Sequence, residues 1–355
     1  MRVVITVPII SPGSGLSRYV FSLCNIFKDG NEVLLIETHT SALSPYTTDE
    51  LAKIDRNIRY ISTGGKGKIY NYISNIKQIR EFRPDVVISN FNGLTQFILP
   101  FINRKTKILH ILHNDAPEFY QIASINARFV DAWIAPTEGI RRHFNDYSKN
   151  RYADRVKVIH HGVDAPGFKG HKSTGPLKIA FVGIVDQHKG ILVVPAIVKR
   201  LIEKGVSLHL SIIGGGGKME WVRDQLKQEI DEGMVTLTGV INHEKVYEYL
   251  AEADVFLYPT HLDAFGLVIA EAMINGAVPV VTHLAGITDN LVEDGKSGFL
   301  VKQDDVESFV KSIQVLAADR SMLGKFSEAA ATRAKELFSM DVMERNYKSL
   351  ISKLG

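Results

Sequence analysis

The chain has 355 residues, of which 45% are apolar and 23% charged, and its formal net charge is +3 at pH 7. This length exceeds one ordinary domain, and the composition is that of a globular protein rather than a disordered or membrane-spanning one. The one cysteine, Cys24, excludes an internal disulfide and fits a reducing cytosol. We therefore expect two domains and a cytoplasmic protein.

Positive charge is concentrated in the first half of the chain. Residues 1–170 hold 22 Lys and Arg against 15 Asp and Glu, whereas residues 171–355 hold 20 against 24. This difference indicates an anionic partner or surface for the first half, although ordinary scatter of surface charge produces the same counts. No nucleic-acid partner is expected.

Short apolar runs that alternate with helical patterns predict buried parallel strands. The first eight residues are expected to form such a strand and not a signal peptide, because Pro8 breaks the apolar run early. The first series of predicted strands comprises residues 3–7, 32–37, 85–89, 107–112, 132–135 and 157–159. The second series comprises residues 177–182, 207–213, 235–238, 255–258 and 278–282. Residues 166–176, between the two series, have the composition of a linker.

Two strand-and-helix series predict an α/β protein with two doubly wound Rossmann-like domains that face each other across a cleft. We place the domains at residues 1–168 and 169–339, with a final helix over 340–355. Ligands of such sheets bind at the carboxyl ends of the strands, so each strand-to-helix loop is a candidate site.

The loop after the first strand contains Gly13, Gly15 and Arg18 and precedes a helix expected from about Leu16 to Phe27. Glycines let backbone amides approach a phosphate, and a helix amino terminus favours an anion. A tight turn without a ligand is the other interpretation. The four glycines 214–217 after a later strand have the same two interpretations.

The most informative stretch is residues 263–273, in which Asp263 is followed by Phe-Gly and by a helix that contains Glu271. Gly276 ends this helix, and a strand over 278–282 follows. A glutamate among apolar residues is rarely buried unless something pairs with it. The hydroxyls of a ribose would provide that pairing. An exposed helix face, a structural lysine or a backbone amide would also explain Glu271.

This stretch resembles the signature of retaining glycosyltransferases with the GT-B fold, in glycosyltransferase family 4. The family pattern has an acidic residue, one residue, Phe-Gly, four residues and Glu-Ala-Met, with Gly and Pro-Val-Val downstream. Asp263 stands where the family usually has glutamate. The resemblance is good over residues 177–300 and loose over the rest of the chain.

The resemblance implies a donor site in the second domain for a nucleotide diphosphate sugar, UDP- or GDP-linked, without a cofactor. Glu271 would accept hydrogen bonds from ribose hydroxyls, and Asp263 would help to hold the sugar and the phosphates. The backbone of four residues would assist Asp263: Ala264, Phe265, Gly266 and Leu267.

Three further loops belong to the implied donor site. In the loop of Gly183, the family has arginine where this chain has Ile184, and Lys189 matches the lysine that neutralises the departing diphosphate. A solvated loop lysine is the alternative for Lys189. The glycines that begin at Gly214 would allow close approach, and the remaining loop would frame the base with Val240 and Ile241.

In the first domain the resemblance implies that His113, at the end of a strand, faces the transferred sugar, although a lone histidine is more often structural. Gly15 and Arg18 would meet the acceptor or the diphosphate. His110 and His113 have no third metal ligand at a telling spacing, and the sequence has no Asp-x-Asp triplet. A metal-independent enzyme is therefore expected, with His113, Lys189 and Asp263 as its catalytic candidates.

The predicted activity is transfer to a glycan or lipid-linked acceptor in cell-envelope polysaccharide or glycoconjugate synthesis. The loss of arginine at Ile184 makes a silent sugar-nucleotide-binding homologue the alternative. Epimerase and phosphorylase relatives fit less well, because the Phe-Gly and Glu-Ala-Met run points away from the former and the chain is short for the latter. The base, the sugar and the linkage stay open.

Two basic segments of the first domain contain aromatic and apolar residues. Residues 66–83 hold five cations, and residues 101–107 hold three more. Such clusters can hold a domain on anionic lipid, which predicts peripheral association with the inner face of the cell membrane. A solvated helix that packs its apolar side inward is the alternative.

Overall fold

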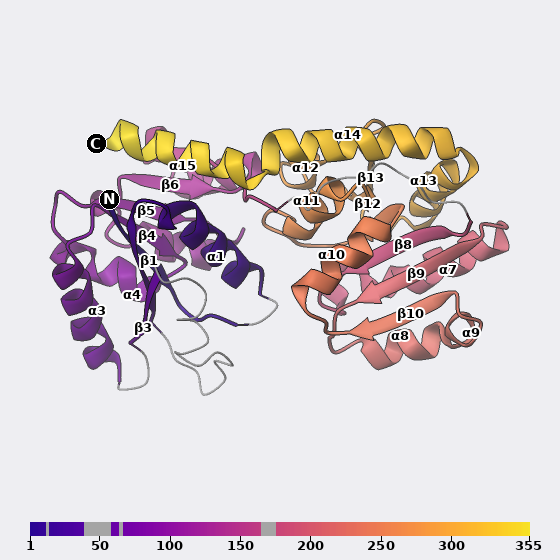
Figure 1. Ribbon diagram of the computed structural model, residues 1–355, viewed down its shortest axis with the longest axis horizontal. Coiled ribbons are helices and arrows are strands. Elements are labelled where there is room, and N and C mark those ends of the chain that lie inside the picture. Colours follow the sequence, from indigo (N-terminus) through magenta and orange to yellow (C-terminus); the bar gives the residue numbers. More distant parts are fainter. Residues whose placement is uncertain (12–13, 39–57, 64–66, 165–174) are drawn as a thin grey trace. The chain divides into compact units, whose positions relative to one another are not determined.

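The structure is a computed structural model that describes residues 1–11, 14–38, 58–63, 67–164 and 175–355 (Figure 1). The chain divides into two compact units. Unit 1 consists of Met1–Gly162 together with Met340–Gly355, and unit 2 consists of Val163–Ser339. Most of the predicted linker, residues 166–176, lies outside the described residues, and so does the predicted boundary at 168.

Unit 1 is built on a parallel sheet with the strand order β3-β2-β1-β4-β5-β6-β7. Its strands are β1 (Arg2–Val7), β2 (Glu32–Glu37), β3 (Ile58–Ser62), β4 (Val86–Asn90), β5 (Lys107–Ile111), β6 (Ala132–Ala135) and β7 (Val156–Val158). Its described helices are α1 (Gly15–Lys28), α3 (Lys68–Phe82), α4 (Gly93–Ile98), α5 (Pro117–Ser124), α6 (Glu138–Tyr147) and α15 (Met340–Leu354), with short 3-10 turns η1 (Leu99–Phe101), η2 (Ala127–Phe129) and η3 (Ala153–Arg155).

Helix α15 is part of the unit 1 core although it lies at the end of the chain. Met343 and Tyr347 are buried there, and the Tyr347 ring meets the edge of Phe27 from α1, with 6.1 Å between ring centroids. Gly162 packs closely against this helix, because an added Cβ would lie 2.8 Å from the sulfur of Met340. The return of the last helix thus completes the apolar core of unit 1.

Unit 2 is built on a second parallel sheet, with the order β10-β9-β8-β11-β12-β13. Its strands are β8 (Leu177–Val182), β9 (Leu208–Ile213), β10 (Val235–Gly239), β11 (Val255–Tyr258), β12 (Val278–Thr282) and β13 (Phe299–Val301). Its helices are α7 (Val194–Glu203), α8 (Met219–Gln225), α9 (Lys227–Asp231), α10 (His243–Glu252), α11 (Leu267–Ile274), α12 (Thr288–Leu291), α13 (Val306–Ala318) and α14 (Arg320–Phe338), with 3-10 turns η4 (Gln187–Lys189) and η5 (Ile191–Val193).

The predicted α/β class with two parallel sheets is confirmed, and the predicted strands lie within one or two residues of the observed ones. The sequence prediction missed β3 and β13. β3 has one fully buried residue, Ile58, and β13 is three residues long and largely half-buried. Arg59 interrupts the apolar residues of β3, and the apolar run of β13 is only three residues long, so neither gives the signal of the inner strands.

Candidate functional site

The loops that follow β8 to β12 lie at one edge of the unit 2 sheet, because these strands are parallel. Backbone hydrogen bonds join the loops to one another. The amide of Val185 donates to the carbonyl of Gly215 at 3.0 Å, and that of Gly214 donates to Gly239 at 3.0 Å. The amide of His261 donates to His188 at 3.0 Å. Backbone hydrogen bonds thus hold the loops of this edge together.

Two glycines are required where these loops approach one another. A Cβ on Gly214 would lie 1.9 Å from the carbonyl oxygen of Gly183, and one on Gly190 would lie 1.7 Å from that of Pro259. Both glycines also have positive φ, +135° and +71°. The glycines of the predicted donor site therefore have a packing role within the protein.

Lys189 and Asp263 form an ion pair at this edge, with 2.9 Å between Nζ and Oδ2. Both side chains are 17% exposed, so the pair is largely shielded from water. Lys189 Nζ also donates to the carbonyl of Leu262 at 3.2 Å and lies over the ring of Tyr258. The structure thus brings together two residues that the sequence analysis placed in the site separately.

The Asp263 carboxylate also holds the start of α11. Its Oδ1 accepts hydrogen bonds from the amides of Ala264, Phe265 and Gly266 at 2.8, 3.2 and 2.8 Å. Its Oδ2 accepts from the hydroxyl of Tyr258 at 2.9 Å. These amides, which were predicted to hold the sugar and phosphates, contact Asp263.

The pKa of Asp263 reflects these contacts. Burial by itself raises the pKa of this carboxyl, but Lys189, the Tyr258 hydroxyl and the amide of Phe265 lower it, and the net shift is downward. Asp263 therefore carries its negative charge at neutral pH and neutralises Lys189.

Glu271 lies one turn into α11 and is buried, with 4% of its side chain exposed. The Nε2 of His243, the first residue of α10, lies 3.1 Å from Glu271 Oε1. His243 is 41% exposed and so connects the buried carboxylate with the surface. Because a protein group already contacts Glu271, its burial alone does not require a ligand.

Several predicted donor residues differ in their exposure. Phe265 belongs to the core, where its ring lies 5.8 Å from that of Phe338. In contrast, Ile184 and Val240 are 54% and 81% exposed, whereas Ile241 and Leu267 are half-buried. Leu262, in the loop before Asp263, is also exposed. Apolar side chains of these loops thus reach solvent, and Leu262 does so next to the ion pair.

In unit 1, His113 lies just after β5 and is half-buried. Its Nε2 lies 3.0 Å from Oδ1 of Asn90 at the end of β4. Its ring meets the edge of Tyr19, with 5.1 Å between centroids, and lies 6.0 Å from the ring of His161. Tyr19 in turn lies 4.1 Å from His161 and hydrogen-bonds through its hydroxyl to that of Tyr347.

The histidines of this group are held neutral. Burial lowers the pKa of His110 to about 3 and, with a contribution from His160, that of His161 to about 3. Burial, followed by the proximity of His161 and His110, lowers the pKa of His113 well below its ordinary value. At neutral pH these side chains offer uncharged donors and acceptors.

The first loop of unit 1 is described in part. Gly13 lies outside the described residues. Gly15 is the first residue of α1, and Arg18 lies in the first turn, half-buried, with its amide bonded to the carbonyl of Ser14 at 3.1 Å. The N-cap residue Ser14 makes no side-chain cap, and the first turn of α1 itself holds no acidic residue to complement the helix dipole.

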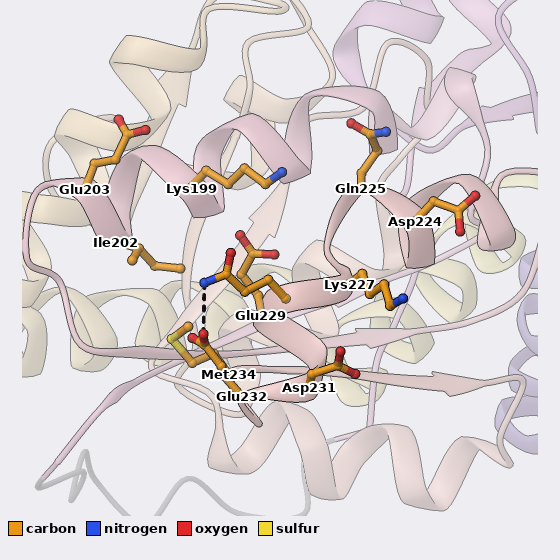
Figure 2. A pocket seen from close by; sticks show the side chains of 11 residues that line it. Lys199, Ile202, Glu203, Asp224, Gln225, Lys227, Glu229, Asp231, Glu232 and Met234 are labelled. Carbon is orange, nitrogen blue, oxygen red and sulfur yellow. Dashed lines mark hydrogen bonds between the residues drawn. The ribbon is translucent and has the colours of Figure 1, made fainter.

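A cavity of about 680 Å³ in unit 2 is lined by none of these residues (Figure 2). It lies between α7, α8 and α9, where Gln228 donates to Glu232 at 2.9 Å. Within the described ranges, no three His, Cys, Asp or Glu side chains gather in a way that could hold a metal ion. In the same part of the chain, every helix is too short or too polar to cross a membrane.

Two family models match the chain in succession: residues 13–165 match the one described as Glycosyltransferase Family 4, and residues 167–333 match the one described as Glycosyl transferases group 1. The chain belongs to this glycosyltransferase family. Anabaena Alr3699/HepE, solved in complex with UDP, superposes on this family 4 chain with a TM-score of 0.82 and 16% identity, over 99% of this chain and 100% of that one. The predicted GT-B fold is confirmed.

Curated relatives of this family 4 chain include a glycogen synthase of Mycobacterium tuberculosis, 26% identical over 50% of this chain and 44% of that protein. The sulfoquinovosyl transferase SQD2 of Arabidopsis thaliana is 23% identical over 72% of this chain and 54% of that protein. The matches thus span about half the length of these relatives.

Sequence reasoning missed His243 and Tyr258 in unit 2, and Tyr19, Asn90 and Tyr347 in unit 1. For His243 a signal existed, since a buried glutamate calls for a partner. Tyr258 lies five residues before its partner Asp263. The residues of unit 1 come from segments far apart in the sequence, and only the fold brings them together.

Proposed function

We propose that this chain is a retaining, metal-independent glycosyltransferase that uses a UDP- or GDP-linked sugar. The observation that carries the proposal is the shielded pair of Lys189 and Asp263 at the same sheet edge as the buried carboxylate of Glu271. Family membership supports it, as does the fold shared with a protein solved with UDP.

In this proposal Glu271 accepts hydrogen bonds from the ribose hydroxyls, and His243 fixes the orientation of its carboxylate. Charge-assisted bonds of this type are short and strong. Val240 and Ile241 contact the base, and the backbone of Gly183 and of Gly214 shapes the space near the phosphates.

Lys189 stabilises the diphosphate as it leaves. An ammonium group has three N–H donors, and Asp263 and the Leu262 carbonyl receive two of them. The third can donate to a phosphate oxygen whose charge grows in the transition state, where electrostatic stabilisation has its largest effect. The amino terminus of α11, which begins directly after the three amides that bond to Asp263, adds a favourable dipole.

The acceptor in this proposal is a glycan or a lipid-linked molecule of cell-envelope polysaccharide or glycoconjugate synthesis, bound at unit 1 near Gly15, Arg18 and His113. The neutral imidazole of His113 has one ring nitrogen that can donate to a hydroxyl group and one that can accept from it. We place the protein in the cytoplasm, peripheral on the inner face of the cell membrane, and the unit 1 surface argued below supports that location.

The test is turnover of a panel of UDP- and GDP-linked sugars without acceptor, followed as nucleotide release with and without a chelator. We expect slow hydrolysis of one nucleotide class and no effect of the chelator. Lys189→Ala should lower turnover by about 10²-fold or more while donor affinity changes less. Lys199→Ala, an exposed lysine of α7, is the matched control. Donor binding without turnover across the panel would instead indicate a silent homologue.

A further inference from the structure

Unit 1 exposes large apolar side chains over α3, α4 and η1. Ile69 and Ile73 of α3 are 77% and 62% exposed, Phe97 of α4 is 51% exposed, and Phe101 of η1 is 53% exposed. Tyr70 is also exposed. Single exposed apolar residues are ordinary, but a contiguous group marks a binding surface.

These side chains are neighbours in space. Ile73 and Phe101 line one groove of about 450 Å³ together with Ile76. Phe97 lies against α3, with 6.2 Å between its ring and that of Tyr72. In Figure 1, α3 is the purple helix at the left edge of unit 1, and α4 packs beside it.

Positively charged side chains lie next to these apolar residues. On α3 the exposed stripe runs from Ile69 and Ile73 to Lys77 and Arg80, at helical spacing. Arg80 Nε donates to the carbonyl of Phe101 at 3.1 Å, which fixes the cation beside the apolar ring. The acid Glu81 pairs with Lys77 at 3.8 Å.

A second cavity, of about 590 Å³, adjoins the groove, because Arg80 and Phe101 line both. Arg83 and Lys105 also line it, and both are exposed. Its acid, Asp85, already accepts a hydrogen bond from the amide of Arg2 at 2.6 Å. The cavity therefore presents three cations to an incoming anion, beside a groove with apolar walls.

We propose that this surface, formed by Ile69, Ile73, Phe97, Phe101, Lys77, Arg80, Arg83 and Lys105 and here called the α3 face, binds an anionic phospholipid bilayer. Lipid phosphates enter the cavity with three cations, while the isoleucines and phenylalanines enter the interface between headgroups and acyl chains. An acidic protein partner would match the same surface, and a wild type that does not bind vesicles would favour it. The proposal stands on unit 1 alone and does not depend on transfer activity. Lys66 and the side chain of Lys68 lie outside the described residues and form no part of it.

Co-sedimentation with vesicles tests the proposal. The full chain is mixed at low salt with vesicles of phosphatidylcholine alone and with vesicles that also contain phosphatidylglycerol. We expect binding to the anionic vesicles only, weakened by added salt. Lys77→Glu combined with Lys105→Glu should lower the partition coefficient by about tenfold or more, and Ile69→Ser combined with Ile73→Ser by a similar factor.

The matched control is Lys199→Glu combined with Lys227→Glu, which makes the same charge change on exposed residues of unit 2. It should bind like the wild type. All variants change exposed side chains, so unchanged thermal midpoints will show that the fold is intact. The proposal is overturned if the wild type ignores anionic vesicles at low salt, if it binds neutral vesicles equally, or if the control loses as much binding as the variants of the α3 face.

Discussion

Both units gather polar side chains where their parallel strands end, but the groups differ in charge. In unit 2 they include an ion pair, Lys189 with Asp263 at 2.9 Å, and Glu271 lies buried beside His243. In unit 1 they are neutral, because burial holds His113 and His161 uncharged next to Tyr19. A shielded ion pair suits a charged diphosphate, whereas neutral imidazoles can donate to and accept from the hydroxyls of a sugar or an acceptor.

The largest expected change in stability comes from breaking the ion pair of unit 2. Asp263→Asn keeps an oxygen for the amides but leaves Lys189 without its counter-charge in a shielded site, which costs about 3 kcal/mol. Denaturant unfolding measures this loss. Glu252→Gln is the matched control, because Glu252 pairs with Lys178 at the same 2.9 Å but both side chains are well exposed, so less than about 1 kcal/mol should be lost. Equal losses of unfolding free energy in the two variants would show that the Lys189–Asp263 pair is no better shielded from water than the exposed pair.

As the pH falls, the stability of unit 1 should decrease at a higher pH than the contribution of the Lys189–Asp263 ion pair in unit 2. His110 and His161 have folded pKa values of about 3, below the ordinary value, so their contribution to stability is complete above pH ~6.5 and is lost as the pH falls toward 3. Each contributes a slope of about 1.4 kcal/mol per pH unit. The lowered pKa of Asp263 places its own loss at lower pH.

Amide hydrogen exchange at about pH 7 and about pH 5 measures this difference, with residues of each sheet as reporters. His161→Asn should reduce the pH dependence of unit 1. In unit 2 the pKa of His209 is also lowered, by burial and by Lys178, but this side chain is partly exposed. If the two sheets lose protection equally between these pH values, the buried histidines do not make unit 1 more sensitive to acid than unit 2.

A smaller loss of stability is expected when the hydrogen bond between the hydroxyls of Tyr19 and Tyr347 is removed. This bond joins α1 to α15 within unit 1. Tyr19→Phe removes one partner of a buried bond and should cost about 1 kcal/mol. In a double-mutant cycle with Tyr347→Phe, the two changes should be coupled by a similar amount. Additive effects would show that the bond contributes nothing.

The smallest change in stability is expected at Ile184, which is 54% exposed. Ile184→Arg should shift stability by less than about 0.5 kcal/mol. It places a second cation in the loop of Lys189 and should raise donor affinity and turnover, because the leaving phosphate gains a charge partner. Unchanged kinetics would mean that other groups already supply this charge.

The sequence predicted the inner strands and the site loops because buried β-branched runs and glycine turns are local signals. It did not predict that Lys189 pairs with Asp263, since the two are 74 residues apart and meet only because β8 lies next to β11. The buried Glu271 called for a partner, but that this partner is His243, 28 residues away, follows only from the packing of α10 against α11. In unit 1, Tyr19 and Tyr347 come from opposite ends of the chain.

Calorimetric titration of UDP and GDP into the wild type and Glu271→Gln tests most directly whether unit 2 is the donor site. We predict that one of the two nucleotides binds the wild type and that the variant, with an unchanged fold, binds it about tenfold or more weakly, because the neutral amide loses its charge-assisted bonds to the ribose. Equal affinity of the two proteins, or no binding of either nucleotide to the wild type, would contradict the assignment.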